Sequence, residues 1–114
     1  MKIEIHTDRH IEGNTELRED ITKEVEHGLS RFGDWITRVE VHLSDANSSA
    51  KSGADDKHCG IEARPANRQP VKVTHASDSV EQAYRGAVKK LERLLGDLHD
   101  KLHHKKGSSS MAGE

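Results

Sequence analysis

Aromatic residues are scarce in this chain of 114 residues, which contains one phenylalanine, one tryptophan and one tyrosine. A core must therefore be built mainly from Ile, Val, Leu and Ala, and the chain lacks a row of aromatic rings for stacking on unpaired nucleic-acid bases. Cys59 is the single cysteine. An intramolecular disulfide is therefore excluded, and a lone thiol fits a reducing compartment.

Long apolar runs are also missing. No segment approaches the roughly 20 consecutive apolar residues that a membrane-spanning helix needs, and the N-terminal sequence MKIEI is not the apolar stretch of a secretory signal. We therefore expect a cytoplasmic protein without a membrane partner. The length allows one domain with a modest core.

Four segments alternate apolar and polar residues, which is the pattern of strands with one exposed face. They are residues 2–7, 35–44, 56–64 and 70–76. In the second segment the alternation predicts Thr37, Val39 and Val41 on the buried face, and Ile36 on the exposed face.

Two further segments repeat apolar residues at helical spacing. The first covers residues 15–32, and the second begins near Ser77 or Asp78 and continues to residue 106. Asp78 and Glu81 resemble a capping box at the start of the second helix.

The predicted order is therefore β-α-β-β-β-α. The first β-α-β unit should join parallel strands, and the next two connections suit antiparallel neighbours. Because each strand offers one apolar face, both helices should pack on one face of a four-stranded mixed sheet, in the α+β class. We expect one α/β domain over residues 1–106 and a flexible Gly/Ser-rich tail over residues 107–114.

The second helix is locally basic in a chain whose formal net charge is −2. Arg85, Lys89 and Arg93 follow one another at i, i+4 and i+8, and Lys90, Lys101 and Lys105 flank them. Such a stripe can track a phosphate backbone, although phosphate contacts position a protein without reading sequence. The alternative is a solvated helix face that carries charges of both signs.

The sequence gives only weak signals for metal binding or catalysis. His99 and His103 have a spacing that can bind metal, but the three or four converging ligands of a zinc site are not evident, so we expect no metal and no cofactor. Cys59 and His58 should lie on opposite faces of one strand, and no Gly-rich phosphate loop is present. We therefore expect neither enzymatic activity nor a small-molecule substrate.

The sheet face away from the helices should carry charges of both signs. His6, Arg38 and His42 are predicted there together with Glu4 and Glu40. Cross-strand pairing among these side chains is favoured over contact with a ligand.

Two sequence runs on this element order resemble a bacterial family, the ribosome hibernation promoting factors, also called ribosome-associated inhibitors or ribosomal subunit interface proteins. The runs are residues 31–45 (RFGDWITRVEVHLSD) and 90–93 (KLER). Residues 55–64 (DDKHCGIEAR) resemble one proteobacterial branch of that family.

The resemblance implies a non-enzymatic factor that binds the small ribosomal subunit through rRNA phosphates, with adjoining ribosomal proteins as candidate further contacts. It would occupy the mRNA/tRNA channel and inhibit translation in stationary phase or stress. On this resemblance we expect a short member of the family, in contrast to long members that add a second, dimerising domain.

Carried over by position, Lys90 and Arg93 match the family's basic run, and Arg18 and Arg31 match basic positions of its first helix. The predicted RNA-binding residues are Arg85, Lys89, Lys90, Arg93, Lys101 and Lys105, with Arg18, Lys23 and Arg31 assisting from the first helix.

The alternative function is a protein–protein interaction module of the same fold. Its motivation is the acidic first helix, which would meet a basic non-ribosomal partner. The acidic residues are Glu16, Glu19, Asp20, Glu24 and Glu26.

Overall fold

The structure, a computed structural model, describes residues 1–8, 11, 14–45 and 56–107, with side chains as far as residue 102. Of the predicted tail, residues 108–114 lie outside the described residues. The elements are β1 (Lys2–Thr7), α1 (Thr15–Gly28), the short 3-10 helix η1 (Ser30–Trp35), β2 (Ile36–Asp45), β3 (Lys57–Pro65), β4 (Val71–Ser77) and α2 (Val80–Gly107).

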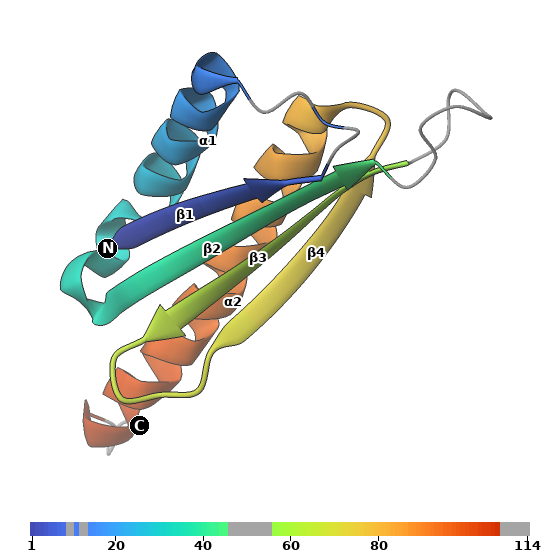
Figure 1. Ribbon diagram of the computed structural model, residues 1–114. Helices are drawn as coiled ribbons and strands as arrows, with labels where there is room; N and C mark the ends of the chain where they lie inside the picture. The colour runs from blue at the N-terminus through green and yellow to red at the C-terminus, as the bar shows by residue number, and fades with distance from the viewer. Residues whose placement is uncertain (9–10, 12–13, 46–55, 108–114) are drawn as a thin grey trace.

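The four strands form one sheet in the order β1-β2-β3-β4. β1 and β2 are parallel, whereas β3 is antiparallel to both β2 and β4. Both long helices lie on one face of the sheet, with α1 beside β1 and α2 across β3 and β4 (Figure 1). The predicted α+β class, element order and one-sided helix layer are confirmed.

One prediction for β2 is wrong. Ile36 is buried and Thr37 is exposed, the reverse of the expected alternation. Ile36 pairs with Pro65 and Arg38 with Arg64, so Thr37 is an extra residue in the ladder, a β-bulge. The Thr37 hydroxyl donates a 3.0 Å hydrogen bond to the Arg64 carbonyl, which holds the side chain outside the core.

The helix boundaries also differ from the prediction. α1 begins after Asn14, whose side-chain oxygen accepts a 2.8 Å hydrogen bond from the Leu17 amide, and it ends at Gly28 rather than at residue 32. The chain then tightens into η1, where Gly33 takes a positive φ of 49° that a residue with a Cβ rarely adopts. α2 is capped by Ser79, whose hydroxyl accepts from the Gln82 amide at 3.1 Å, and not by Asp78.

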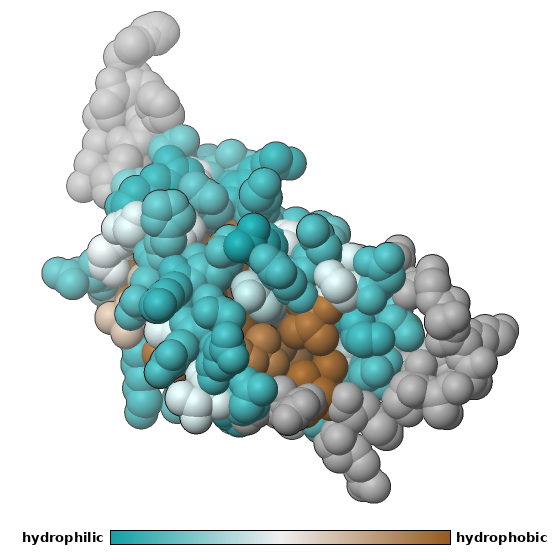
Figure 2. Space-filling model, turned by 90° about the horizontal axis from the view of Figure 1, so that it is seen from above, coloured by the Kyte–Doolittle hydropathy of each residue, from teal (hydrophilic) through white to brown (hydrophobic). Residues whose placement is uncertain are grey.

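A single apolar core fills the space between the sheet and the helices. Its largest fully buried side chains include Ile21, Leu29, Ile36, Ile61, Leu91 and Leu95. Cys59 is buried in the same core, as expected, and burial raises the pKa of its thiol to about 12. The face seen from above shows mostly hydrophilic side chains, with a hydrophobic area among them (Figure 2). Within the described part of the chain, no helix is long and apolar enough to cross a membrane.

The two helices touch where α1 ends. A Cβ added at Gly28 would lie 2.5 Å from the Cγ1 atom of Val88, which is itself buried. A branched side chain in a filled core has little freedom to move aside. Gly28 therefore sets how closely α1 approaches α2.

The replacement Gly28→Ala should destabilise the protein. Overpacking typically costs about 1–3 kcal/mol, which exceeds the gain of up to about 1 kcal/mol in helix propensity. The measurement is chemical denaturation followed by circular dichroism. Gly60→Ala is the control, because its Cβ would meet only ordinary contacts at 3.6 Å or more and should leave stability equal or slightly higher. Equal stability of Gly28→Ala and wild type would contradict the close helix contact.

Candidate nucleic-acid interface

A shallow hollow on the helix layer is lined by Arg31, Lys89, Glu92 and Arg93. We call it the basic hollow. Lys89 and Arg93 are exposed and one turn apart on α2, whereas Arg31 comes from η1, far away in the sequence. Three cationic groups and one carboxylate therefore face the same space, which gives the hollow a net positive charge.

Arg31 reaches this position because Gly96 lets its side chain lie directly on α2. A Cβ at Gly96 would collide with the Arg31 guanidinium. The guanidinium also lies 4.8 Å from the centroid of the Phe32 ring, an arrangement that favours a cation. The hollow is thus partly organised before any ligand arrives, although Arg31 itself remains exposed.

Arg85 and Lys23 lie in a neighbouring region of mixed charge. Arg85 forms ion pairs with Glu81 at 3.1 Å and with Glu24 of α1 at 3.8 Å. Lys23 lines the same region, which also contains Asp20. Acidic groups surround the two cations, so this region attracts polyanions less than the basic hollow does.

Lys90 and Arg18 contact the two outer strands. The Lys90 ammonium donates a 2.9 Å hydrogen bond to the Thr74 carbonyl of β4. The Arg18 guanidinium donates a 2.8 Å hydrogen bond to the Ile5 carbonyl of β1. Each helix is therefore attached to the strand beneath it by a basic side chain, and these two predicted site residues are not brought together with the basic hollow.

Fewer of the predicted site residues can be placed in the C-terminal part of α2. Lys101 is exposed two turns beyond Arg93, and the side chain of Lys105 lies outside the described residues. The His99 ring packs edge-on against Trp35, with ring centroids 5.0 Å apart. The side chain of His103, its predicted partner in a metal-binding pair, is also outside the described residues.

The outer face of the sheet is organised around Arg38, which pairs with two of the acidic residues predicted on the same face. One Nη atom of Arg38 lies 2.8 Å from a Glu4 oxygen and 2.7 Å from a Glu40 oxygen. The hydrogen bond from Arg38 holds the pKa of the Glu4 carboxyl below its ordinary value, against the opposing effect of burial. This face therefore neutralises its own charges to a large extent.

The fold is shared with two solved structures. One is the N-terminal domain of Protein Y from Thermus thermophilus, with a TM-score of 0.68 at 20% identity over 86% of this chain and 99% of that chain. Another is a ribosomal subunit interface protein from Coxiella burnetii, with a TM-score of 0.64 at 17% identity over 87% of this chain and 98% of that chain. At these identities the likeness shows the arrangement of the elements alone.

The family is shown by the sequence itself. Residues 3–103 match the family described as Sigma 54 modulation protein / S30EA ribosomal protein, and the chain belongs to that family. No curated protein shows significant sequence similarity to the chain. The predicted family resemblance is confirmed.

Replacing Arg38 with Gln should raise the pKa of Glu4, because the hydrogen bond and the charge that favour its carboxylate are lost. A carboxyl with a lowered folded-state pKa adds stability above its unfolded-state pKa, and that stability disappears as pH falls through the folded-state pKa. The stability difference between wild type and Arg38→Gln should therefore be present at neutral pH and shrink on acidification.

The measurement is an NMR titration of the Glu4 side-chain carboxyl carbon. Arg64→Gln is the matched control, because Arg64 pairs in register with Arg38 on the next strand but forms no ion pair with Glu4 among the described residues. A Glu4 pKa that stays low in Arg38→Gln would contradict this assignment.

Proposed function

We propose that this protein is a non-enzymatic ribosome-binding factor that acts in ribosome hibernation. It binds the small ribosomal subunit, occupies the mRNA/tRNA channel and inhibits translation in stationary phase or stress. Membership of the S30EA family supports this proposal, as does the fold shared with a protein named for the ribosomal subunit interface. Occupation of space needed by mRNA and tRNA requires no catalytic group.

The observation that carries the contact surface is the convergence of Arg31 with Lys89 and Arg93. Arginine can hold a phosphate through two parallel hydrogen bonds, whereas lysine acts as a point charge. Two guanidinium groups and one ammonium around a shallow hollow therefore suit the phosphates of a folded RNA backbone. The carboxylate of Glu92 limits how much nonspecific anion binding the hollow supports.

The remaining predicted RNA-binding residues take different parts in this proposal. Lys101 extends the contact along α2, and Lys105 stays a predicted contact residue. Arg85 and Lys23 contribute less because acids surround them. Lys90 and Arg18 act mainly by holding the helices to the outer strands.

Reversing the charges of the basic hollow should weaken binding to small ribosomal subunits. In the triple variant Arg31→Glu, Lys89→Glu, Arg93→Glu, the slope of log affinity against log salt should flatten by roughly two to three units, because each phosphate contact contributes about 0.7–0.9. The measurement is co-sedimentation with purified subunits, free of mRNA and tRNA, over a range of salt concentrations.

A matched control reverses Lys2, Arg64 and Lys72, which are exposed on the opposite face of the sheet. It changes the net charge by the same amount and should retain most of the affinity. Equal losses in the two variants would contradict the assignment of the basic hollow. Absence of binding by the wild type, even at low salt, would contradict the function and favour a basic protein partner for the acidic face of α1, where Glu16, Glu19 and Glu26 are exposed.

Inhibition should follow from competition for the channel. Adding the protein in molar excess over ribosomes should reduce synthesis of a reporter in a purified translation system, and pre-binding mRNA and initiator tRNA should delay the effect. The hollow-reversed variant should inhibit less at the same concentration. Undiminished synthesis at a concentration that saturates the subunits would contradict steric inhibition.

A further inference from the structure

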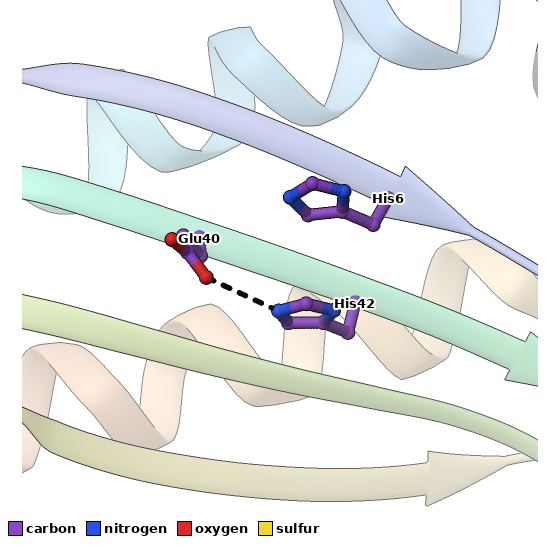
Figure 3. Close-up of side chains that lie close together, drawn as sticks. All are labelled: His6, Glu40 and His42. Atoms are coloured by element: carbon purple, nitrogen blue, oxygen red, sulfur yellow. Dashed lines mark hydrogen bonds and ion pairs between the residues drawn. The ribbon is translucent and has the colours of Figure 1, made fainter.

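The outer face of the sheet carries a cluster that the proposed ribosome contact does not use. The parallel register of β1 and β2 sets His6 directly beside His42. Their rings stack with centroids 4.8 Å apart and planes 14° from parallel. Glu40 precedes His42 by two residues and therefore projects from the same face, with one carboxylate oxygen 3.4 Å from the His42 Nε2 atom (Figure 3).

These three side chains each offer one metal-ligating atom, and the three atoms all lie within 4.8 Å of one another. A tetrahedral ion with bonds of about 2.0–2.1 Å needs its ligand atoms roughly 3.3 Å apart. The cluster therefore has to contract and its rings have to turn out of the stack. The side chains have room for this movement, because His6, His42 and Glu40 are 51%, 50% and 27% exposed.

The carboxylates around the cluster are held in place by neighbouring side chains. Arg38 holds one Glu40 oxygen at 2.7 Å, which leaves the other oxygen directed toward His42. Glu4 places a second carboxylate 3.7 Å from the His6 Nε2 atom. Lys2 lies 3.7 Å from the Glu4 carboxylate, so two carboxylates face two cations and the fixed charges balance. Hydrogen-bonded carboxylates of this kind orient metal ligands.

We propose that His6, Glu40 and His42 form a binding site for a divalent transition-metal ion. Two imidazoles and one carboxylate select Zn²⁺ or its borderline neighbours such as Ni²⁺ over Mg²⁺ and Ca²⁺, which prefer oxygen ligands. Solvent water supplies the remaining coordination position on this open face. The site lies on the sheet face opposite the basic hollow, so it is independent of the proposed RNA contact.

A bound ion would connect β1 to β2 through side chains as well as through the backbone ladder. Among the described strands, β1 lies at the border of the sheet next to β2. Because the unfolded chain does not hold His6 beside His42, an ion at this site binds the folded state preferentially and raises its thermal stability.

The test is isothermal titration of the full chain without an affinity tag, using zinc chloride, nickel chloride and, as a negative probe, magnesium chloride. We expect one Zn²⁺ per chain and a thermal unfolding midpoint that rises with Zn²⁺ and returns to its starting value with a chelator. His6→Gln and His42→Gln should each weaken Zn²⁺ binding by at least about tenfold, since even an outer-shell partner contributes that much.

Two controls separate this site from other histidines. His58→Gln changes an exposed histidine on the same sheet face and should leave Zn²⁺ affinity unchanged. A double variant, His99→Gln with His103→Gln, removes the pair on α2 and should also leave it unchanged. A thermal unfolding transition measured for each variant in the presence of chelator establishes that the variant is folded without metal.

Two results would overturn the proposal. One is Zn²⁺ binding that persists in His6→Gln and His42→Gln but disappears in the α2 double variant. The other is no saturable Zn²⁺ binding by the wild type, in which case the stacked rings are a cross-strand pair and nothing more.

Discussion

The contact between Gly28 and Val88 fixes the distance between the two helices, and much of the molecule depends on that distance. With few large side chains available, the core is filled by aliphatic residues, and the helices must come close together to exclude water. α1 then ends beside α2, and the chain tightens into η1 before entering the sheet. This path delivers Arg31 to the surface of α2 and creates the basic hollow. The hollow is therefore a product of core packing rather than of the α2 sequence alone.

The one-sided sheet separates two kinds of charged surface. The helix layer carries cations that converge without enough acids to neutralise them. The outer sheet face carries acids, bases and histidines that pair with one another across neighbouring strands, with Arg38 between Glu4 and Glu40. A chain with a small negative net charge can thus carry a cationic hollow on its helix layer and a largely charge-balanced outer sheet face.

The elements and their order were predictable because alternation and helical spacing are local patterns. The boundaries were less so. The bulge at Thr37 depends on the partner strand, since the sequence of β2 alternates without interruption. The early end of α1 is hidden because Leu29 and Phe32 continue the apolar stripe and are both buried, although Phe32 belongs to η1.

The candidate site was predictable only in part, for a related reason. The stripe of Lys89 and Arg93 follows from helical spacing, but their meeting with Arg31 requires the tertiary packing of η1 on Gly96. Lys90 looks equivalent to Lys89 in the sequence, yet it turns toward β4. The pairing of His6 with His42 depends on the register of two parallel strands that are joined through a helix, and no local pattern encodes that register.

The hydrogen bonds of Arg18 and Lys90 have a consequence for the sheet as a whole. β1 and β4 are its outer strands, and outer strands are templates on which another chain can add a strand of its own. A long cationic side chain bound to a carbonyl of each strand competes with an incoming backbone amide for that acceptor. It also places a positive charge beside each outer strand. The same two residues that attach the helices to the sheet therefore also occupy a backbone acceptor on each outer strand.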